Sequence, residues 1–336
     1  MKIAIDAMGG DNAPSIVIEG IALALKKFSD FEAVIVGNET QLKPFLEEFK
    51  IADHDRIEVV HADEVVTMGE PSTIALRSKK NSSITVAATL VSKGKADAIV
   101  SAGHTGAAVA ATTVKIRTME GIERPAIATI MPARDGKFIL CDAGANTDCK
   151  PQNLAQFAIM AEAYYKLMFG KEEPTIGLLS VGEEDAKGND LTKETFKILS
   201  GMPINFIGNV EGNDMFEKKA DIVVCDGFVG NVVLKNSEGL AKTIMFWLKR
   251  SFTKKIIRKI GALLAKGAFE DLKKMSDKNE YGGAPLLGLK KPCIIGHGSS
   301  NAVAIMNAIR VAREFLNADV NDKISKRITE SNISID

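Results

Sequence analysis

The stretch Ala98-Ile99-Val100-Ser101-Ala102-Gly103-His104-Thr105-Gly106-Ala107-Ala108-Val109-Ala110-Ala111 decides the fold of this chain. Its apolar start, its glycines and its alanine-rich end predict a strand, a tight turn and the first turns of a helix. The first backbone N–H groups of a helix lack partners within the helix, and the helix dipole adds partial positive charge there. Because Gly103 and Gly106 let the backbone approach a phosphate closely, the stretch predicts an anion-binding loop.

The same order of strand, polar turn and helix recurs along the chain. The further turns lie at residues 6–14, 142–146, 226–231 and 296–301, and each follows a short apolar run. In an open parallel sheet, ligands bind in the crevice beyond the carboxyl ends of the strands. We therefore expect these Gly-, Asn- and Asp-rich turns to share one polar cleft.

The composition is that of an ordinary globular protein. Of 336 residues, 46% are hydrophobic and 26% charged, and 43 basic residues balance 43 acidic ones. A chain without net charge and with few aromatic residues is a poor candidate for nucleic-acid binding. The four cysteines form no C-x-x-C pair, and neither a signal peptide nor a membrane-spanning apolar run is visible. These features predict a cytoplasmic protein with reduced thiols.

Strands and helices alternate along most of the chain, which predicts an α/β fold: a three-layer α/β/α unit around a mostly parallel sheet. We expect one large unit over residues 1–336, either undivided or in two lobes around the cleft. Residues 126–131 and 137–141 are predicted to form an antiparallel pair joined at Asp135-Gly136. The residues from about Asp319 onward predict a loose polar tail. The strands are expected at residues 2–6, 33–37, 57–61, 96–100, 175–181, 204–208, 222–225 and 293–295.

The familiar nucleotide and nucleophile motifs are absent from the sequence. There is no P-loop, no G-x-S-x-G elbow and no H-E-x-x-H, and residues 296–301 place Asn301 where a dinucleotide fingerprint has its third glycine. We therefore expect no metal, nucleotide or other cofactor. Two histidines, His104 and His297, lie in predicted turns, where a lone histidine serves either structure or catalysis.

These turns carry a resemblance that runs in order over nearly the whole chain. Residues 2–14, 101–108, 142–153, 178–190, 221–239 and 281–301 together resemble the bacterial phosphate acyltransferases of phospholipid synthesis, the PlsX family. The resemblance implies transfer of a long-chain fatty acyl group from acyl carrier protein to inorganic phosphate. The product is acyl-phosphate, used for phosphatidic acid by a membrane glycerol-phosphate acyltransferase. It also implies a homodimer with a fold similar to isocitrate and isopropylmalate dehydrogenases and to phosphate acetyltransferases.

The reaction suits a cleft without a covalent nucleophile. Phosphate near neutral pH is partly dianionic and attacks a thioester directly, so the protein has to position it and stabilise the oxyanion. We predict that uncharged donors do this, with His104, Asn146 and Asn231 as catalytic residues. The predicted phosphate- and substrate-binding residues are Asp6, Gly9, Gly10, Gly103, Thr105, Gly106, Asp142, Gly144, Gly227, Gly230 and His297.

Two functions of other classes remain open at this point. One is a metal- and NAD-dependent decarboxylating dehydrogenase of similar fold, although no carboxylate set or adenosine signature is evident in the sequence. The other is a non-catalytic, membrane-associated scaffold of the phospholipid pathway. Activity with acyl carrier thioester and phosphate, with and without nicotinamide cofactor and divalent metal, distinguishes the three.

A basic and apolar segment lies at residues 244–275. Residues 249–266 carry seven Lys or Arg and no acidic residue, while apolar residues recur there at spacings of three and four. Gly261 and Gly267 interrupt the pattern, which predicts a projecting helical hairpin; an amphipathic helix packed on the sheet is the alternative. The segment suits an anionic membrane surface, or the acidic carrier protein, or both. The predicted contact residues are Lys254, Lys255, Ile256, Ile257, Arg258, Ile260, Leu263 and Leu264.

Overall fold

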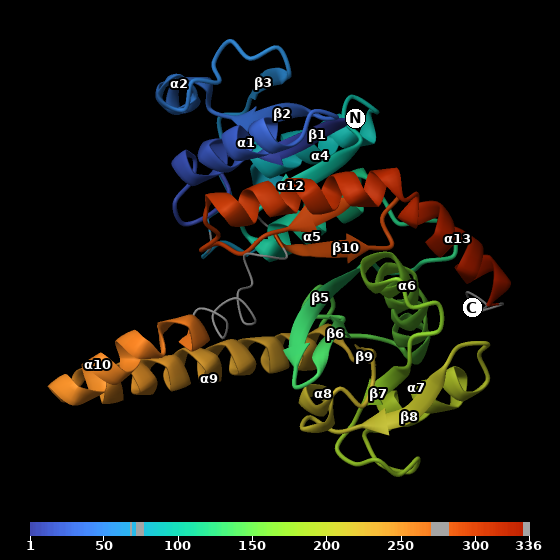
Figure 1. Cartoon of the computed structure of the whole chain (residues 1–336). Helices are drawn as coiled ribbons and strands as arrows, with labels where there is room; N and C mark the ends of the chain where they lie inside the picture. The colour runs from blue at the N-terminus through green and yellow to red at the C-terminus, as the bar shows by residue number, and fades with distance from the viewer. Residues whose placement is uncertain (68, 72–76, 270–281, 332–336) are drawn as a thin grey trace.

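One continuous sheet organises the computed structural model, which describes residues 1–67, 69–71, 77–269 and 282–331 (Figure 1). The described strands follow the order β3-β2-β1-β4-β11-β10-β5-β6-β9-β7-β8 across the sheet. Their bounds are β1 (Lys2–Asp6), β2 (Glu32–Gly37), β3 (Ile57–His61), β4 (Ala98–Ser101), β5 (Ala126–Ala133), β6 (Gly136–Cys141), β7 (Ile176–Leu179), β8 (Phe206–Val210), β9 (Ile222–Val224), β10 (Ala284–Leu287) and β11 (Cys293–Ile295).

Neighbouring strands are parallel except in the middle of the sheet. There, β10 is antiparallel to both β11 and β5, and β5 is antiparallel to β6. The predicted mostly parallel α/β sheet is confirmed, and so is the antiparallel pair, with Ala128 opposite Cys141 and Ala133 opposite Gly136. Strand β10 was not predicted, because a four-residue run beginning Ala-Pro gives little periodic signal.

Helices cover both faces of the sheet. Because side chains alternate along a strand, Ile3 and Ile5 of β1 pack into one core while Ala4 packs into another. The first core contains α1 (Ser15–Lys27), α6 (Pro151–Phe169) and α12 (Ala302–Asn317), and the second contains α4 (Ser83–Ser92) and α5 (Thr105–Lys115). Outside the projecting arm, the described residues also form α2 (Glu39–Glu48), α7 (Asp190–Ser200), α8 (Asp214–Glu217) and α13 (Val320–Glu330).

The chain from residue 320 to residue 330 forms helix α13, so the predicted loose tail is wrong there. Val320, Ile324 and Ile328 are spaced four residues apart and are buried, and they place α13 against α6. Only three of the eleven residues are apolar, which hid this stripe among polar neighbours. Residues 332–336 lie outside the described residues.

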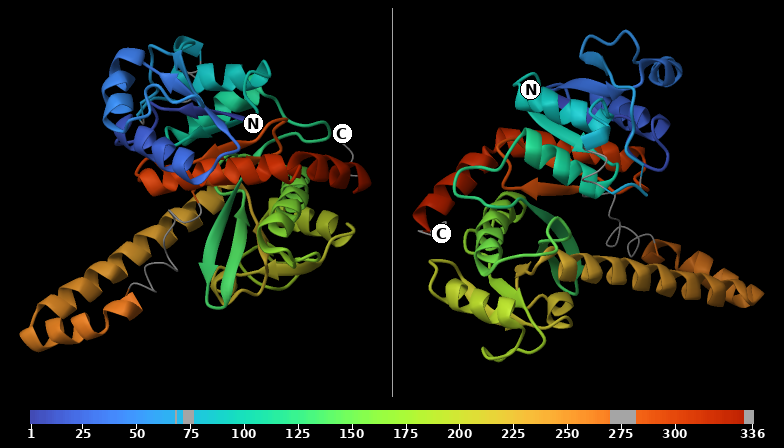
Figure 2. Two further views of the ribbon diagram at one scale, coloured as in Figure 1. Left: turned by 45° about the horizontal axis from the view of Figure 1, so that its top comes forward. Right: turned by 180° about the vertical axis from the view of Figure 1, so that it is seen from behind.

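A long helical arm extends from the body of the molecule in every view (Figures 1 and 2). It consists of α9 (Gly227–Thr253), which runs outward, and α10 (Ile256–Leu264), which returns beside it. The rings of Phe252 and Phe269 meet edge to face with centroids 5.2 Å apart. Gly261 lies inside α10, so the expected break there is wrong: the chain turns at Lys254 and Lys255.

The arm exposes large apolar side chains. Leu263 is 71% exposed and Leu264 is 84% exposed, and α10 buries none of its residues. None of the described helices is long and apolar enough to cross a membrane. Of the predicted hairpin, residues 270–275 lie outside the described residues.

Candidate functional site

Three of the predicted polar turns meet at one edge of the sheet. They follow β1, β4 and β11, which are parallel neighbours, so their carboxyl ends lie together. The N–H of Asp11 donates to the carbonyl of Gly298 at 2.8 Å, and the N–H of Gly296 donates to the carbonyl of Ser101 at 2.8 Å. A Cβ on Gly9 would lie 2.8 Å from the backbone nitrogen of Gly103, so only glycine fits this approach.

A pocket opens beside this junction, between the N-termini of α4 and α5. The partial positive charge at the N-terminal ends of two helix dipoles makes such a place favourable for an anion. Val65 and Val66 add an apolar wall that the sequence analysis did not include. The lining residues are Asp6, Gly9, Val65, Val66, Ser83, Ile84, Ser101, Gly103, His104 and Ala107.

His104 is the N-cap of α5 and presents one ring nitrogen as a donor. Its Nδ1 accepts a hydrogen bond from the N–H of Ala107 at 3.1 Å. In the neutral ring the proton therefore sits on Nε2, which leaves an N–H for a ligand oxygen. Thr105 and Gly106 form the first turn of α5 behind it. This arrangement is compatible with the predicted role of His104 as an uncharged donor.

Asp6 organises the pocket from within. It is 3% exposed, and its Oδ2 accepts from the hydroxyl of Ser101 at 2.7 Å while its Oδ1 accepts from the N–H of Met8 at 3.3 Å. Burial raises the pKa of the Asp6 carboxyl, and hydrogen bonds from the Ser83 and Ser101 hydroxyls oppose that rise. The N–H of Gly103 donates to the Ser101 oxygen at 3.2 Å, so this N–H is already paired within the loop.

The turn after β11 lies beside this pocket. Gly10 has a φ of +123°, and a Cβ there would lie 3.3 Å from the carbonyl oxygen of Gly298. The Nδ1 atom of His297 accepts from the N–H of Ser299 at 3.1 Å, and the N–H of His297 donates to Ser300 Oγ at 3.1 Å. These contacts hold the loop, and the role of His297 toward a substrate stays a prediction.

The other two predicted turns form a second group, after β6 and β9. The N–H of Gly227 donates to the carbonyl of Asn146 at 2.7 Å. A Cβ on Gly230 would collide with the carbonyl oxygen of Asp142, and one on Gly144 would lie 3.3 Å from the Cβ of Asn231. The start of α9 is therefore packed directly onto the turn after β6.

In this second group, Asp142 and Asn146 hold the backbone. The two oxygens of Asp142 accept from the backbone N–H groups of Ile127, Gly144, Ala145 and Asn146 and from the Asn146 side chain, at 2.8–3.1 Å. Burial raises the pKa of Asp142, and these N–H groups oppose the rise. The side-chain amide of Asn146 donates both to Asp142 and to the carbonyl of Pro125 at 2.7 Å. Both its hydrogens are used, so the structure leaves Asn146 no donor for a substrate, whereas Asn231 is exposed.

The two groups do not lie along one edge as the sequence analysis expected. Strands β10 and β5 separate them, and because three successive pairs are antiparallel, β6 and β9 run opposite to β1, β4 and β11. Helix α5 connects the groups, since its Val109 packs into the same core as Ala143 and Ala145. Ser83 and Ile84 also line the pocket and were not among the predicted site residues.

Comparison with known proteins identifies the family. The family model described as "Fatty acid synthesis protein" matches residues 1–323. A phosphate acyltransferase of Thermodesulfovibrio yellowstonii is 49% identical over 98% of this chain and 95% of its own, and one of Aquifex aeolicus is 47% identical over 96% of each. This chain belongs to the phosphate acyltransferase family. Its members are enzymes, and the match to the family model covers the residues of both groups of turns described above.

Solved structures support the fold at much lower identity. A phosphotransacetylase from Streptococcus pyogenes has a TM-score of 0.61 at 20% identity, with 94% of each chain covered. A 4-hydroxythreonine-4-phosphate dehydrogenase from Klebsiella pneumoniae has a TM-score of 0.51 at 15% identity, covering 93% of this chain and 98% of its own. The expected likeness to phosphate acetyltransferases and to a dehydrogenase fold is thus confirmed for the fold alone.

Proposed function

We propose that this phosphate acyltransferase moves a long-chain fatty acyl group from acyl carrier protein to inorganic phosphate, and that phosphate binds in the pocket between α4 and α5. The convergence of two helix N-termini and the glycine junction on that pocket carries the assignment of the site. Phosphate held there attacks the thioester carbonyl through one of its oxygens. The carbonyl oxygen becomes an oxyanion, the C–S bond breaks, and the carrier leaves as a thiolate.

The residues of the pocket divide this work. The Nε2–H of His104 donates to a phosphate oxygen or to the developing oxyanion, where one well-placed donor is worth about 3–4 kcal/mol. The first turns of α4 and α5 bind the phosphate charge, and Val65 and Val66 exclude water from the reacting carbon. A thiolate is a good leaving group, so no acid is assigned to it. The donor role predicted for Asn231 stays a prediction, because Asn231 belongs to the second group of turns and does not line this pocket.

The test is to incubate the purified chain with an acyl carrier thioester and phosphate and to measure acyl-phosphate as its hydroxamate. We expect product that saturates with phosphate, unchanged by exhaustive chelation and by nicotinamide cofactor. Hydride transfer that depends on cofactor and divalent metal would support the dehydrogenase instead. Absence of any turnover by the folded protein would favour the scaffold.

The arm is assigned to surfaces outside the pocket. Ile256, Ile257, Ile260, Leu263 and Leu264 on α10 are each at least 54% exposed, among the basic residues 254, 255 and 258. An apolar face with flanking Lys and Arg suits the headgroup boundary of an anionic bilayer, which would bring a cytoplasmic enzyme to the membrane that uses its product. The same charges suit the acidic carrier protein as a second ligand.

Helix α9 carries a further exposed apolar face, which we assign to a second copy of the chain. Leu240, Ile244 and Trp247 are 56%, 44% and 58% exposed and are spaced four and three residues apart, on one side of the helix. Large exposed apolar patches are characteristic of protein interfaces. We expect the wild-type chain to sediment as a dimer and the Leu240→Asp/Trp247→Asp variant to sediment as a monomer.

A further inference from the structure

The carboxylate of Asp6 lines the proposed phosphate pocket, where its contacts suit a role in the framework better than one as a phosphate ligand. The hydroxyl of Ser101 donates to its Oδ2 at 2.7 Å and the N–H of Met8 donates to its Oδ1 at 3.3 Å, while Ser83 and Gly9 line the same pocket and lower its pKa. Both carboxylate oxygens therefore already accept a hydrogen bond from within the protein. A second anion placed against this carboxylate would also be repelled.

These residues around Asp6 come from three separate parts of the pocket. Ser101 ends β4, Ser83 begins α4, and Met8 and Gly9 belong to the turn after β1. The Ser101 hydroxyl gives its hydrogen to Asp6 and uses a lone pair to accept the N–H of Gly103 at 3.2 Å. The carboxylate is thus connected to the turn that leads into α5, as well as to the first residue of α4.

The atoms around this carboxylate are packed so closely that a shift of Asp6 would also move its neighbours. A Cβ on Gly9 would lie 2.6 Å from Oδ2 of Asp6, and one on Gly103 would lie 3.4 Å from the same atom. Ser83 and Ser101 are 2% exposed, so solvent does not replace their contact with Asp6. Hydrogen bonds to a charged acceptor are stronger than those between neutral groups, and more so away from water.

We infer that Asp6 is a positioning residue, which fixes the N-termini of α4 and α5 relative to each other through the hydroxyls of Ser83 and Ser101. The inference rests on the proposed function, because the gap between these two helix ends is the proposed phosphate site. Ser83 and Ser101 thereby acquire a role that no sequence motif indicated. Asp6 itself moves from the predicted phosphate ligands to the framework that orients them.

The test separates this role from general stability. Asp6→Asn, Ser83→Ala and the double variant are compared with Ser82→Ala as a matched control. Ser82 is equally buried and precedes Ser83, but its hydroxyl donates to Thr85 at 2.8 Å. We expect Asp6→Asn and Ser83→Ala each to raise the KM for phosphate about tenfold without raising that for the acyl carrier thioester. Ser82→Ala should leave both KM values unchanged.

The double variant decides whether the two residues act together. If Asp6 acts through Ser83, the double variant will have a KM for phosphate no higher than the larger of the two single-variant values. The inference would be overturned if the rise in phosphate KM of the double variant equalled the product of the two single-variant rises. A folded Asp6→Asn enzyme with the wild-type KM for phosphate would also overturn it. Should Asp6→Asn fail to fold, Ser83→Ala and Ser101→Ala decide: an unchanged phosphate KM in both would overturn it. In each of those cases, acyl-phosphate formation by the wild type that saturates with phosphate would still support the proposed function.

Discussion

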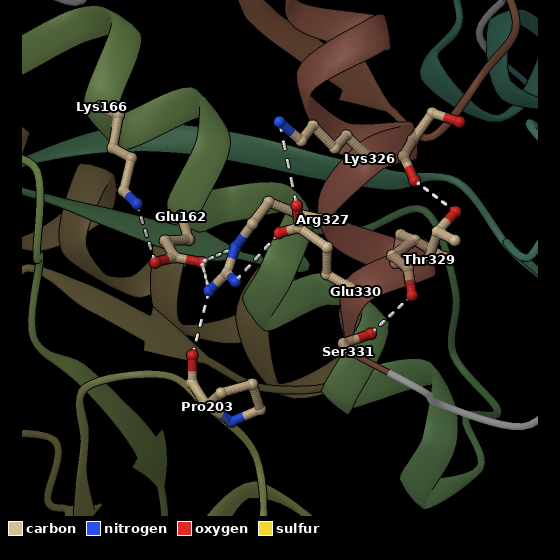
Figure 3. Close-up of polar contacts among 10 residues, drawn as sticks. Glu162, Lys166, Pro203, Lys326, Arg327, Thr329, Glu330 and Ser331 are labelled. Atoms are coloured by element: carbon tan, nitrogen blue, oxygen red, sulfur yellow. Dashed lines mark hydrogen bonds and ion pairs between the residues drawn. The ribbon is translucent and has the colours of Figure 1, made fainter.

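Arg327 on α13 donates two hydrogen bonds to one oxygen of Glu162 on α6, at 3.0 Å from Nη2 and 3.3 Å from Nε (Figure 3). The same guanidinium donates to the carbonyl of Pro203 at 3.0 Å, while Lys166 approaches the other oxygen of Glu162 at 3.1 Å. The Glu162 side chain is 6% exposed, so its charge depends on these partners. This contact attaches the last described helix to the half of the molecule that holds β7 and β8.

We expect Arg327→Ala to lower the free energy of unfolding by about 2 kcal/mol. Removing one partner of a buried pair typically costs about 3–5 kcal/mol, and the remaining Lys166 reduces that here. Denaturant unfolding measures the change. Lys326→Ala is the matched control, because Lys326 is 79% exposed and lies 4.0 Å from Glu330. Equal stability of the two variants would contradict the importance of the Glu162 contact.

Gly9→Ala should abolish acyl transfer to phosphate while the chain remains folded. The added Cβ would lie 2.6 Å from Asp6 Oδ2 and 2.8 Å from the nitrogen of Gly103, and the backbone of the turn cannot accommodate it without moving. Gly103→Val should raise the KM for phosphate for the same reason, since its Cβ would lie 3.0 Å from the Cα of Gly9. Gly212→Ala, with open space around it, serves as the control. Wild-type phosphate kinetics in folded Gly9→Ala would place the site elsewhere.

His104→Asn distinguishes catalysis by His104 from its capping role. Asparagine is a favoured N-cap, so its side-chain oxygen can still accept from Ala107, but it lacks the Nε2–H that the imidazole presents. We expect a loss in kcat of roughly 10²–10³ with little change in melting temperature. A folded variant that retains near-wild-type kcat would remove His104 from the reaction.

The sequence predicted the architecture well because the signals were local. Apolar runs followed by glycine turns identify parallel strands, and the same pattern located the glycine-rich turns after β1, β4 and β11. Strand direction was not predicted because it is not a local property: the missed β10 and the pair β5–β6 reverse the direction of the second half. One cleft shared by both groups of turns stays a prediction. Asn146 resembled a free donor in sequence, and only its two hydrogen bonds reveal that its amide is fully used.

Other features depended on contacts between distant residues. Ser83 lies 77 positions from Asp6, and nothing in its own segment indicates that the two residues line one pocket. The role of α13 depends on Arg327 reaching Glu162, 165 positions away. The expected catalytic and binding roles of Asn231, His297 and Thr105 stay predictions, for which alanine variants assayed at saturating and limiting phosphate are the measurement.

Acidification should weaken the fold through Asp221. Burial raises the pKa of this carboxyl, but the Lys171 ammonium at 2.5 Å and hydrogen bonds from Thr175 and Tyr165 outweigh it, so the pKa lies below its ordinary value. The contact therefore stabilises the native state above about pH 4, and that stability is lost as the pH falls through the lowered pKa. Asp221→Asn should be less stable than wild type at pH 7, and the difference in denaturant unfolding should shrink as the pH falls below about 4. A constant difference between the two proteins across that range would contradict this.

The apolar face of α10 is expected to bind anionic membranes. Wild-type protein should co-sediment with vesicles containing phosphatidylglycerol, and Ile256→Glu/Leu263→Glu should not, because each change places a carboxylate where an aliphatic chain would enter the headgroup boundary. Val114→Glu/Val181→Glu is the matched control, since it replaces side chains that are 59% and 82% exposed on other elements. Binding should weaken with salt and on zwitterionic vesicles, because the Lys and Arg of the arm are each worth about 1 kcal/mol near an anionic surface. Equal sedimentation of the wild type and the α10 variant, or none by the wild type, would exclude the membrane assignment.

A raised KM for the acyl carrier thioester in Lys254→Glu/Arg258→Glu, without a change in vesicle binding, would assign the basic residues to the carrier protein.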